Sequence, residues 1–96
     1  MELKEILELL VKGIVQTESD VIVNESSGQI MHGKETSHFT IRVKQEEFSL
    51  LVGKEGSTIK ALRIIMSKLA GKKKRMVFVD LDEQKKIYKA NNERNS

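Results

Sequence analysis

Hydrophobic positions near the start of the chain repeat with the period of a helix. They fall at i, i+3, i+4, i+7, i+8 and i+11, and they are Leu3, Ile6, Leu7, Leu10, Val11 and Ile14. This spacing predicts an amphipathic helix that buries one face, and Gly13 is expected to mark or weaken its end. A β-branched run, Val21-Ile22-Val23, then predicts a short first strand between Asp20 and Asn24.

Residues 24–37 lack a regular hydrophobic pattern. They contain two glycines among many small polar residues, which predicts a long hairpin loop, with Gln29–His32 as the segment that would extend a strand. Beyond the loop, Phe39, Ile41 and Val43 alternate with polar residues. Such alternation is the pattern of a half-buried strand, so a second strand is expected here.

Residues 45–52 predict a short helix. Glu46 and Glu47 suit a first helical turn, where the helix dipole favours negative charge. Phe48, Leu51 and Val52 follow on one face. A short helix is therefore expected to precede the Gly53-Lys54-Glu55-Gly56 interruption.

A longer helix is expected after the interruption. Ser57 is its predicted N-cap, Gly71 is expected to end it, and Met66 is expected in the core. Its hydrophobic face contains Ile59, Leu62, Ile65, Met66 and Leu69. Residues 76–81 then predict a third strand.

These elements follow the order helix, strand, strand, helix, helix, strand. That order predicts one α+β domain over residues 1–82. Residues 83–96 are mostly polar and predict a C-terminal tail that is partly helical or disordered, with a short helix at Gln84–Lys89.

The composition of the chain excludes several classes of protein. The chain has 96 residues, 39% of them hydrophobic, and contains no cysteine, which excludes disulfides, thiolate metal sites and thiol nucleophiles. No apolar run approaches the length of a membrane span, and the first residues lack the pattern of a signal peptide. A cytoplasmic protein without a membrane partner is therefore expected.

The net charge of +3 is unevenly distributed. Residues 1–50 carry five basic and nine acidic side chains, whereas residues 51–96 carry twelve basic and five acidic ones. Residues 54–75 hold eight of the basic side chains and one acidic residue, Glu55. A basic segment within an otherwise acidic fold indicates a polyanionic partner, although a solvated helix face explains the charge alone equally well.

The residue types of the Gly53–Gly56 turn indicate a site that binds phosphate. Glycines permit backbone conformations closed to other residues and allow a close approach of another backbone. The first amides of the following helix are unpaired and carry partial positive charge. With Lys54 beside them, they would form a cradle for phosphate oxygens.

The run from Leu51 to Arg63, Leu-Val-Gly-Lys-Glu-Gly-Ser-Thr-Ile-Lys-Ala-Leu-Arg, resembles the signature of a KH domain. The helix-strand-strand start resembles the type II arrangement, and the small size resembles the stand-alone bacterial KH proteins of the KhpA kind. This resemblance covers roughly residues 1–82. It implies a three-stranded mixed sheet with three helices on one face, and non-catalytic binding of single-stranded RNA by a GxxG clamp and an apolar groove.

The resemblance also assigns roles to individual residues. The clamp would be Gly53, Lys54, Glu55 and Gly56, and residues 24–37 would be the variable loop. Arg75–Phe78 would form the opposite wall of the groove. The full set expected to contact RNA is Val52, Gly53, Lys54, Glu55, Gly56, Ser57, Thr58, Ile59, Lys60, Leu62, Arg63, Arg75 and Val77.

Beyond the site, the resemblance implies a homodimer and a second KH-containing RNA-binding protein as partner. It also implies an RNA-chaperone or post-transcriptional regulatory role. The chain departs from the KH pattern in two ways. Glu55 places a negative charge in the clamp, and the chain has few aromatic residues for base stacking. Modest affinity with loose base preference is therefore expected.

Two other classes of function are open alternatives. A KH fold that has lost RNA binding and serves as a dimerisation or assembly adaptor is favoured by Glu55 and opposed by the basic residues of 54–75. A small enzyme is disfavoured, because no nucleophile–base arrangement occurs and a chain of this length rarely encloses a deep pocket. No catalytic residue, cofactor or metal is therefore expected.

Other polar residues are interpreted as surface groups. His32 and His38 lie in or beside the predicted loop, which would not hold metal ligands in a convergent arrangement. Asp80, Asp82 and Glu83 are interpreted as a solvated strand end. The segment Lys72–Arg75 stays open between a solvated turn and a phosphate-contacting rim.

Overall fold

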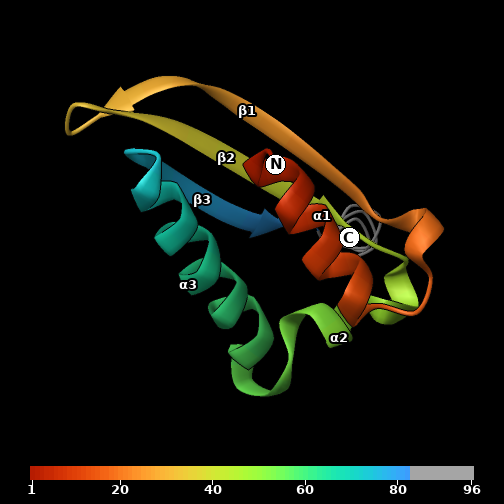
Figure 1. The fold of residues 1–96 in the computed structure, drawn as a ribbon. Helices are drawn as coiled ribbons and strands as arrows, with labels where there is room; N and C mark the ends of the chain where they lie inside the picture. The colour runs from red at the N-terminus through yellow and green to blue at the C-terminus, as the bar shows by residue number, and fades with distance from the viewer. Residues whose placement is uncertain (83–96) are drawn as a thin grey trace, which may run out of the picture.

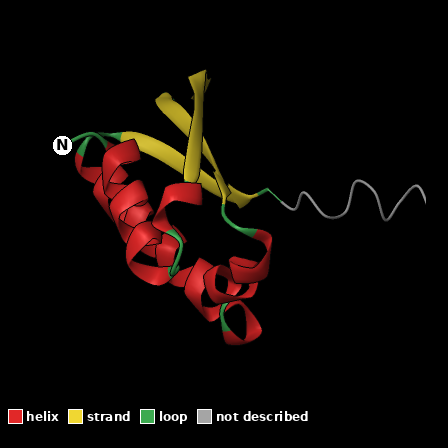
Figure 2. Ribbon diagram, turned by 90° about the vertical axis from the view of Figure 1, so that its right-hand side faces the viewer, coloured by secondary structure: helices red, strands yellow, loops and turns green. Residues whose placement is uncertain are grey.

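Helices and strands form two layers in the computed structural model, which describes residues 1–82 (Figure 1). The main elements are α1 (Leu3–Ile14), β1 (Ile22–Met31), β2 (Lys34–Arg42), α2 (Phe48–Val52), α3 (Ser57–Lys72) and β3 (Arg75–Leu81). Short 3₁₀ turns stand at Glu18–Asp20, Gln45–Glu47 and Lys54–Gly56. Figure 2 shows the helices gathered on one side of the sheet. The predicted α+β fold of a KH domain is thereby confirmed.

The sheet is mixed and has the order β1-β2-β3. β1 pairs with β2 antiparallel, and β2 pairs with β3 parallel. A parallel pair needs a long crossover connection, and here α2 and α3 provide it. β3 is consequently an edge strand, and no other described strand pairs with its second edge.

Alternate residues of each strand face the helices and form the core. Phe39 lies opposite Val79, and Val23 lies opposite Ile41, and these four side chains are at most 3% exposed. The helices complete the core with Leu3, Leu7, Val11, Leu51, Ile59, Leu62, Met66 and Ala70. The buried valine, leucine, isoleucine, phenylalanine and methionine side chains each stabilise the fold by about 1.5–3 kcal/mol relative to an exposed position.

The prediction of a long loop at residues 24–37 is wrong. β1 runs to Met31 and β2 begins at Lys34, so that only His32 and Gly33 form the turn, with φ of 52° and 77°. Two positive φ values in a two-residue turn are typical of type I′, which suits the twist of a hairpin. The strand extension expected at Gln29–His32 is confirmed as far as Met31, whereas His32 belongs to the turn. Most side chains of this arm are exposed, which explains the missing hydrophobic alternation.

Several element boundaries also differ from the expectation. Gly56 rather than Ser57 is the N-cap residue of α3, whereas Gly13 lies in the last turn of α1, which ends at Ile14, close to the expected end. Ile65 is 41% exposed and does not belong to the buried face of α3, whereas Met66 lies in the core as expected. The helix expected at residues 84–89 and the rest of the tail lie outside the described residues.

A buried carboxylate joins the end of α1 to the start of α2. Glu47 Oε2 accepts a hydrogen bond from the Thr17 hydroxyl at 2.7 Å. Its Oε1 accepts from the backbone N–H groups of Thr17 and Gln16 at 3.0 and 3.1 Å. The Thr17 hydroxyl, followed by these backbone donors, holds the pKa of Glu47 below its ordinary value of 4.5. The sequence had indicated only a residue of a first helical turn.

Candidate nucleic-acid interface

The turn between α2 and α3 requires glycine at its first position. Gly53 has φ 79° and ψ 173°, a region open essentially to glycine alone. A Cβ atom there would lie 2.6 Å from the backbone N of Thr58. The Gly53 N–H donates to the Ser49 carbonyl at 2.9 Å. Gly53 therefore ends α2 and brings its own backbone against the first turn of α3.

The second glycine is the N-cap of α3. Gly56 has φ 79° and ψ 13°, the left-handed conformation, and no side-chain hydrogen bond caps the helix. An added Cβ would meet only Lys60 Cε, at 3.7 Å. The Ser57 N–H donates to the Lys54 carbonyl within the turn. No side chain caps the start of α3 beside this open backbone, an arrangement suited to binding an anion.

The two charged residues of the turn are exposed, with Lys54 and Glu55 both at its surface. Glu55 adopts φ 54° and ψ 29°, a left-handed conformation that costs a non-glycine residue about 1–2 kcal/mol. Ser57 and Thr58 follow in the first turn of α3. One positive and one negative side chain therefore flank the same backbone cradle.

The apolar residues predicted for the groove divide into two groups. Ile59 and Leu62 are 6% and 3% exposed and belong to the core, so they support the turn from beneath. Val52 and Val77 are only partly buried, at the end of α2 and on β3. The accessible apolar surface of the predicted site is therefore small and comes from these two valines.

The predicted basic residues have different surroundings. Lys60 is exposed on α3. Arg63, one turn further along, donates from Nε to the backbone carbonyl of Val79 at 2.9 Å, and its Nη2 lies 3.5 Å from Asp80 Oδ1. The Arg63 guanidinium therefore links α3 to the outer edge of β3, beside which α3 runs (Figure 1).

Arg75 stands apart from the clamp. Its Nη1 donates to Glu35 Oε1 and its Nη2 donates to Ser37 Oγ, both at 2.6 Å, and the side chain is 25% exposed. Arg75 follows the C-terminal end of α3, whereas the clamp precedes its N-terminal end, and 16 helical residues span about 24 Å. The structure thus does not bring Arg75 together with Gly53–Gly56.

A hollow lies at the outer edge of β3, with a volume of about 390 Å³. It is lined by His38, Arg63, Ser67, Val77, Phe78, Val79 and Asp80. Two of these, Arg63 and Val77, were predicted as site residues. Asp80, interpreted from the sequence as part of a solvated strand end, is the penultimate residue of β3 and is exposed, and its Oδ2 also lies 2.5 Å from His38 Nε2. His38 lies in β2 rather than beside a loop.

Sequence reasoning did not bring His38, Phe78 and Asp80 together, because it had no register for the sheet. In the parallel pair, His38 lies opposite Phe78 and Thr40 lies opposite Asp80. Phe39 and Val79 face the core from the same two strands. The alternation of polar with apolar residues in both strands was the available signal.

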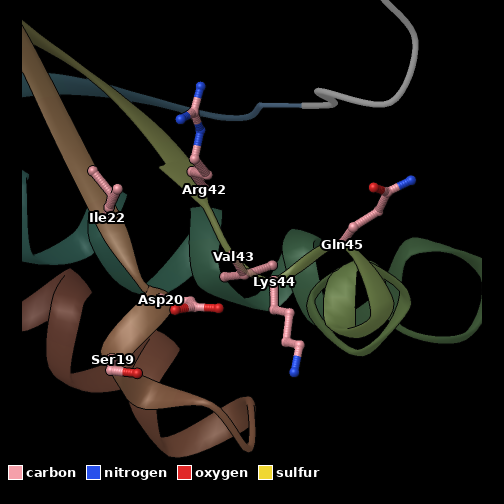
Figure 3. Close-up of a pocket in the computed structure, with 7 residues that line it drawn as sticks. All are labelled: Ser19, Asp20, Ile22, Arg42, Val43, Lys44 and Gln45. Atoms are coloured by element: carbon pink, nitrogen blue, oxygen red, sulfur yellow. The ribbon is translucent and has the colours of Figure 1, made fainter. Parts of the chain in front are cut away.

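A second hollow of about 360 Å³ lies near the start of β1 (Figure 3). It is lined by Ser19, Asp20, Ile22, Arg42, Val43, Lys44 and Gln45. None of the residues predicted to contact RNA belongs to this set. The predicted site and this hollow are therefore separate features of the surface.

Residues 1–82 contain neither a cluster of metal ligands nor a membrane-spanning helix. No three histidine, aspartate or glutamate side chains in this range converge as ligands for a metal ion. None of the helices in the described range is long and apolar enough to cross a membrane.

Comparison with known proteins identifies the family to which the chain belongs. A family model described as the KH domain of KhpA and KhpB matches residues 4–81, which include both helices that flank the Gly53–Gly56 turn. The chain belongs to this family. Because the matched family is a KH domain, the prediction of a non-catalytic protein is confirmed.

Curated relatives resemble this KH domain over most of their length. A protein of Thermotoga maritima is 38% identical over 72 residues, covering 75% of this chain and 89% of its own length. A protein of Streptomyces coelicolor is 35% identical over 80 residues, covering 83% and 95%, respectively. One of Clostridium perfringens is 30% identical over 79 residues, covering 82% and 99%. All three are named RNA-binding protein KhpA, whereas no solved structure matches the chain.

Proposed function

We propose that this KH domain binds single-stranded RNA, with the Gly53–Gly56 turn as the clamp on the sugar–phosphate backbone. The observation that carries the proposal is the conformation of the two glycines, which leaves the start of α3 without a capping side chain beside an exposed Lys54. A GxxG loop of this kind clamps about four nucleotides in KH domains. The names of the curated relatives support the same ligand.

Charge adds a salt-dependent part to the binding. Lys54 and Lys60 are exposed at the clamp and along α3, where each can neutralise a phosphate and release a counterion. Glu55 opposes them from within the clamp. The balance favours binding that weakens as the salt concentration rises.

Bases would lie against the apolar surface next to the clamp. Val52 at the end of α2 offers an accessible apolar group there, and Val77 offers another farther along on β3, while Ile59 and Leu62 keep the floor rigid from within the core. Ser57 and Thr58 bring hydroxyl groups to the first turn of α3. Arg63 lies further along the same path. Arg75 supports the sheet rather than the clamp, since its guanidinium already binds two side chains.

A charge-reversal variant of the clamp tests this function. Lys54→Asp combined with Glu55→Asp is expected to abolish RNA binding in a fluorescence-polarisation assay, while thermal unfolding stays nearly unchanged because both side chains are exposed. Lys68→Asp is the matched control, because it reverses an exposed charge on α3 outside the predicted site. Unaltered RNA affinity in the folded double variant would exclude the clamp. A large loss of melting temperature would show that the two side chains are structural.

The cellular role proposed for this domain is RNA chaperoning or post-transcriptional regulation in the cytoplasm. A single groove with little accessible apolar surface holds RNA weakly, so two linked sites would raise the affinity by effective concentration. We therefore propose a homodimer, with a second KH-containing RNA-binding protein as a further partner. Residues 1–82 would form the binding domain, and residues 83–96 would be a polar tail that is partly helical or disordered.

Light scattering tests the dimer. A species of twice 10.9 kDa is expected, and an RNA long enough to reach both grooves should bind more tightly than one of single-site length. A monomer at cellular concentrations, together with equal affinity for short and long RNA, would contradict the proposal.

An interaction adaptor is the second candidate function. Glu55 within the clamp favours it, and so do the exposed side chains of Ile64 and Ile65 on α3, 57% and 41% accessible. Exposed apolar side chains that lie together are typical of surfaces that contact other proteins. A filter-binding assay with a random RNA pool separates the two functions, because an adaptor that has lost RNA binding would retain no RNA at low salt.

A further inference from the structure

The outer edge of β3 presents an aromatic side chain that the clamp does not use. Phe78 is 40% exposed and lies opposite His38 in the parallel pair. The two ring centroids are 6.1 Å apart with an interplanar angle of 45°. Since the neighbouring Val79 faces the core, Phe78 points to the opposite side of the sheet. An exposed ring of this kind is a platform on which a base can stack.

Polar groups stand at the rim of the same platform. The Asp80 carboxylate lies between two basic side chains, with Oδ2 at 2.5 Å from His38 Nε2 and Oδ1 at 3.5 Å from Arg63 Nη2. The side chains of Asp80, His38 and Arg63 are 56%, 50% and 48% exposed. The carboxylate is therefore oriented by two partners and still open to a third group.

The hollow around these residues has the size and chemistry of a small ligand site. Its volume of about 390 Å³ falls within the range of about 300–1,000 Å³ found for ligand pockets. Phe78 and Val77 supply apolar surface, Asp80 accepts hydrogen bonds, and the Arg63 guanidinium donates them. Arg63 also links the hollow to α3, whose first turn begins at the clamp.

We propose that this hollow binds one guanine base of the RNA strand. The base would stack on Phe78 while its N1–H and N2–H donate to the Asp80 carboxylate and its O6 accepts from Arg63. The proposal rests on the RNA-binding function proposed above. It adds a base-specific contact beside a clamp that reads only the backbone.

The donor pattern of guanine decides the choice of base. Its Watson–Crick edge presents two adjacent N–H donors next to a carbonyl acceptor, which matches a carboxylate beside a guanidinium. Adenine and cytosine each offer one amino group next to an unprotonated ring nitrogen, and uracil offers a single N–H between two carbonyls. Only guanine can donate two parallel hydrogen bonds to Asp80.

A single-base substitution series tests the proposal. Oligouridines of about eight nucleotides, twice the number that a KH clamp holds, would carry one guanosine at each position in turn. At the favoured position, guanosine is expected to bind at least about five-fold more tightly than adenosine, cytidine or uridine, the low end of the range for a bidentate base contact. Inosine, which lacks the N2 amino group, should lose most of that gain. This comparison needs only the wild-type protein.

Variants locate the contact. Asp80→Asn should remove the preference for guanosine, and Phe78→Ala should weaken binding of every oligonucleotide that has a base at this position. Asp82→Asn is the matched control, because Asp82 pairs with Arg42 and does not line the hollow. Circular-dichroism melting would verify that each variant is folded.

Three results would overturn the proposal and leave the RNA-binding function standing. They are RNA binding without base preference, equal affinity for guanosine and inosine, and a guanosine preference that survives in Asp80→Asn. A change of oligomeric state in Asp80→Asn without a change in RNA affinity would assign the β3 edge to a protein partner instead. Failure of the wild-type protein to bind any RNA would overturn both proposals.

Discussion

The backbone of Gly53 lies directly against Thr58, so that a Cβ atom at Gly53 would come within 2.6 Å of the Thr58 backbone N. This contact joins the end of α2 to the first turn of α3 across the proposed clamp. The other clamp glycine, Gly56, has open space at the corresponding position except for the flexible end of Lys60. The two glycines of the motif are therefore not equivalent.

Alanine substitutions should separate them. Gly56→Ala is expected to lower the free energy of unfolding by about 1–2 kcal/mol, the cost of a left-handed conformation for a residue with a Cβ. Gly53→Ala should lower it further, because its backbone region is closed to alanine and the new atom meets backbone that cannot move aside. Urea denaturation measures both. Equal losses for the two variants would show that the Thr58 contact has no energetic weight.

Alanine at Gly13 should have the opposite effect on stability from alanine at the clamp glycines. Gly13 lies inside α1, is exposed, and has nothing within 4 Å of an added Cβ. Gly13→Ala should therefore raise the free energy of unfolding by about 0.5–1 kcal/mol, because alanine loses less backbone entropy in a helix. Thermal melting checks this. A lower melting temperature would contradict the placement of Gly13 within the helix.

Glu47→Gln should destabilise the fold and flatten its acid sensitivity. The folded protein holds the pKa of Glu47 below 4.5 through the donors of Thr17 and Gln16. Its contribution is therefore present above the unfolded pKa and is lost as the pH falls through the lowered folded value. Unfolding curves at pH 7 and at successively lower pH would show a wild-type advantage that shrinks with acid.

Glu46→Gln is the control for this effect, because Glu46 is exposed beside Glu47. Its stability should follow that of the wild type at every pH. If Glu46→Gln and Glu47→Gln behave alike, the hydrogen bonds to Thr17 do not stabilise the native state.

The two charges of the clamp should act on RNA in opposite directions. Repulsion between Glu55 and a nearby phosphate is of the order of 1 kcal/mol at an effective dielectric constant near 20 or above. Glu55→Gln should tighten RNA binding several-fold at low salt, and the gain should shrink as salt screens it. Lys54→Gln should weaken binding and reduce the salt slope by about 0.7 for one lost phosphate contact.

Affinity titrations across salt concentrations measure both effects. If Glu55→Gln weakens RNA binding at every salt concentration, the carboxylate accepts a hydrogen bond from a base or from the turn. Glu55 would then shape the site rather than oppose the ligand. The left-handed conformation of Glu55 is present in either case.

The order of the elements and most of the core follow from patterns in the amino-acid sequence. Helical spacing predicted α1 and α3, and alternation at Phe39, Ile41 and Val43 predicted the second strand, because these patterns follow directly from the periods of helix and strand. The GxxG turn was also visible as a motif, and the backbone conformation of Gly53 explains why its first position needs glycine. The local sequence pattern was sufficient to predict an element wherever that helix or strand buries one face.

Features that depend on partners distant in the chain became visible only once the elements were packed together. Residues 24–37 lacked alternation because the hairpin arm extends where it has no helix to cover it, and polar strands of this kind look like loops in a sequence. Glu47 acquires its partners about thirty residues away, and Asp80 meets His38 only through the register of two parallel strands. Register and crossover are set by packing of the whole domain, so no local pattern could place these side chains together.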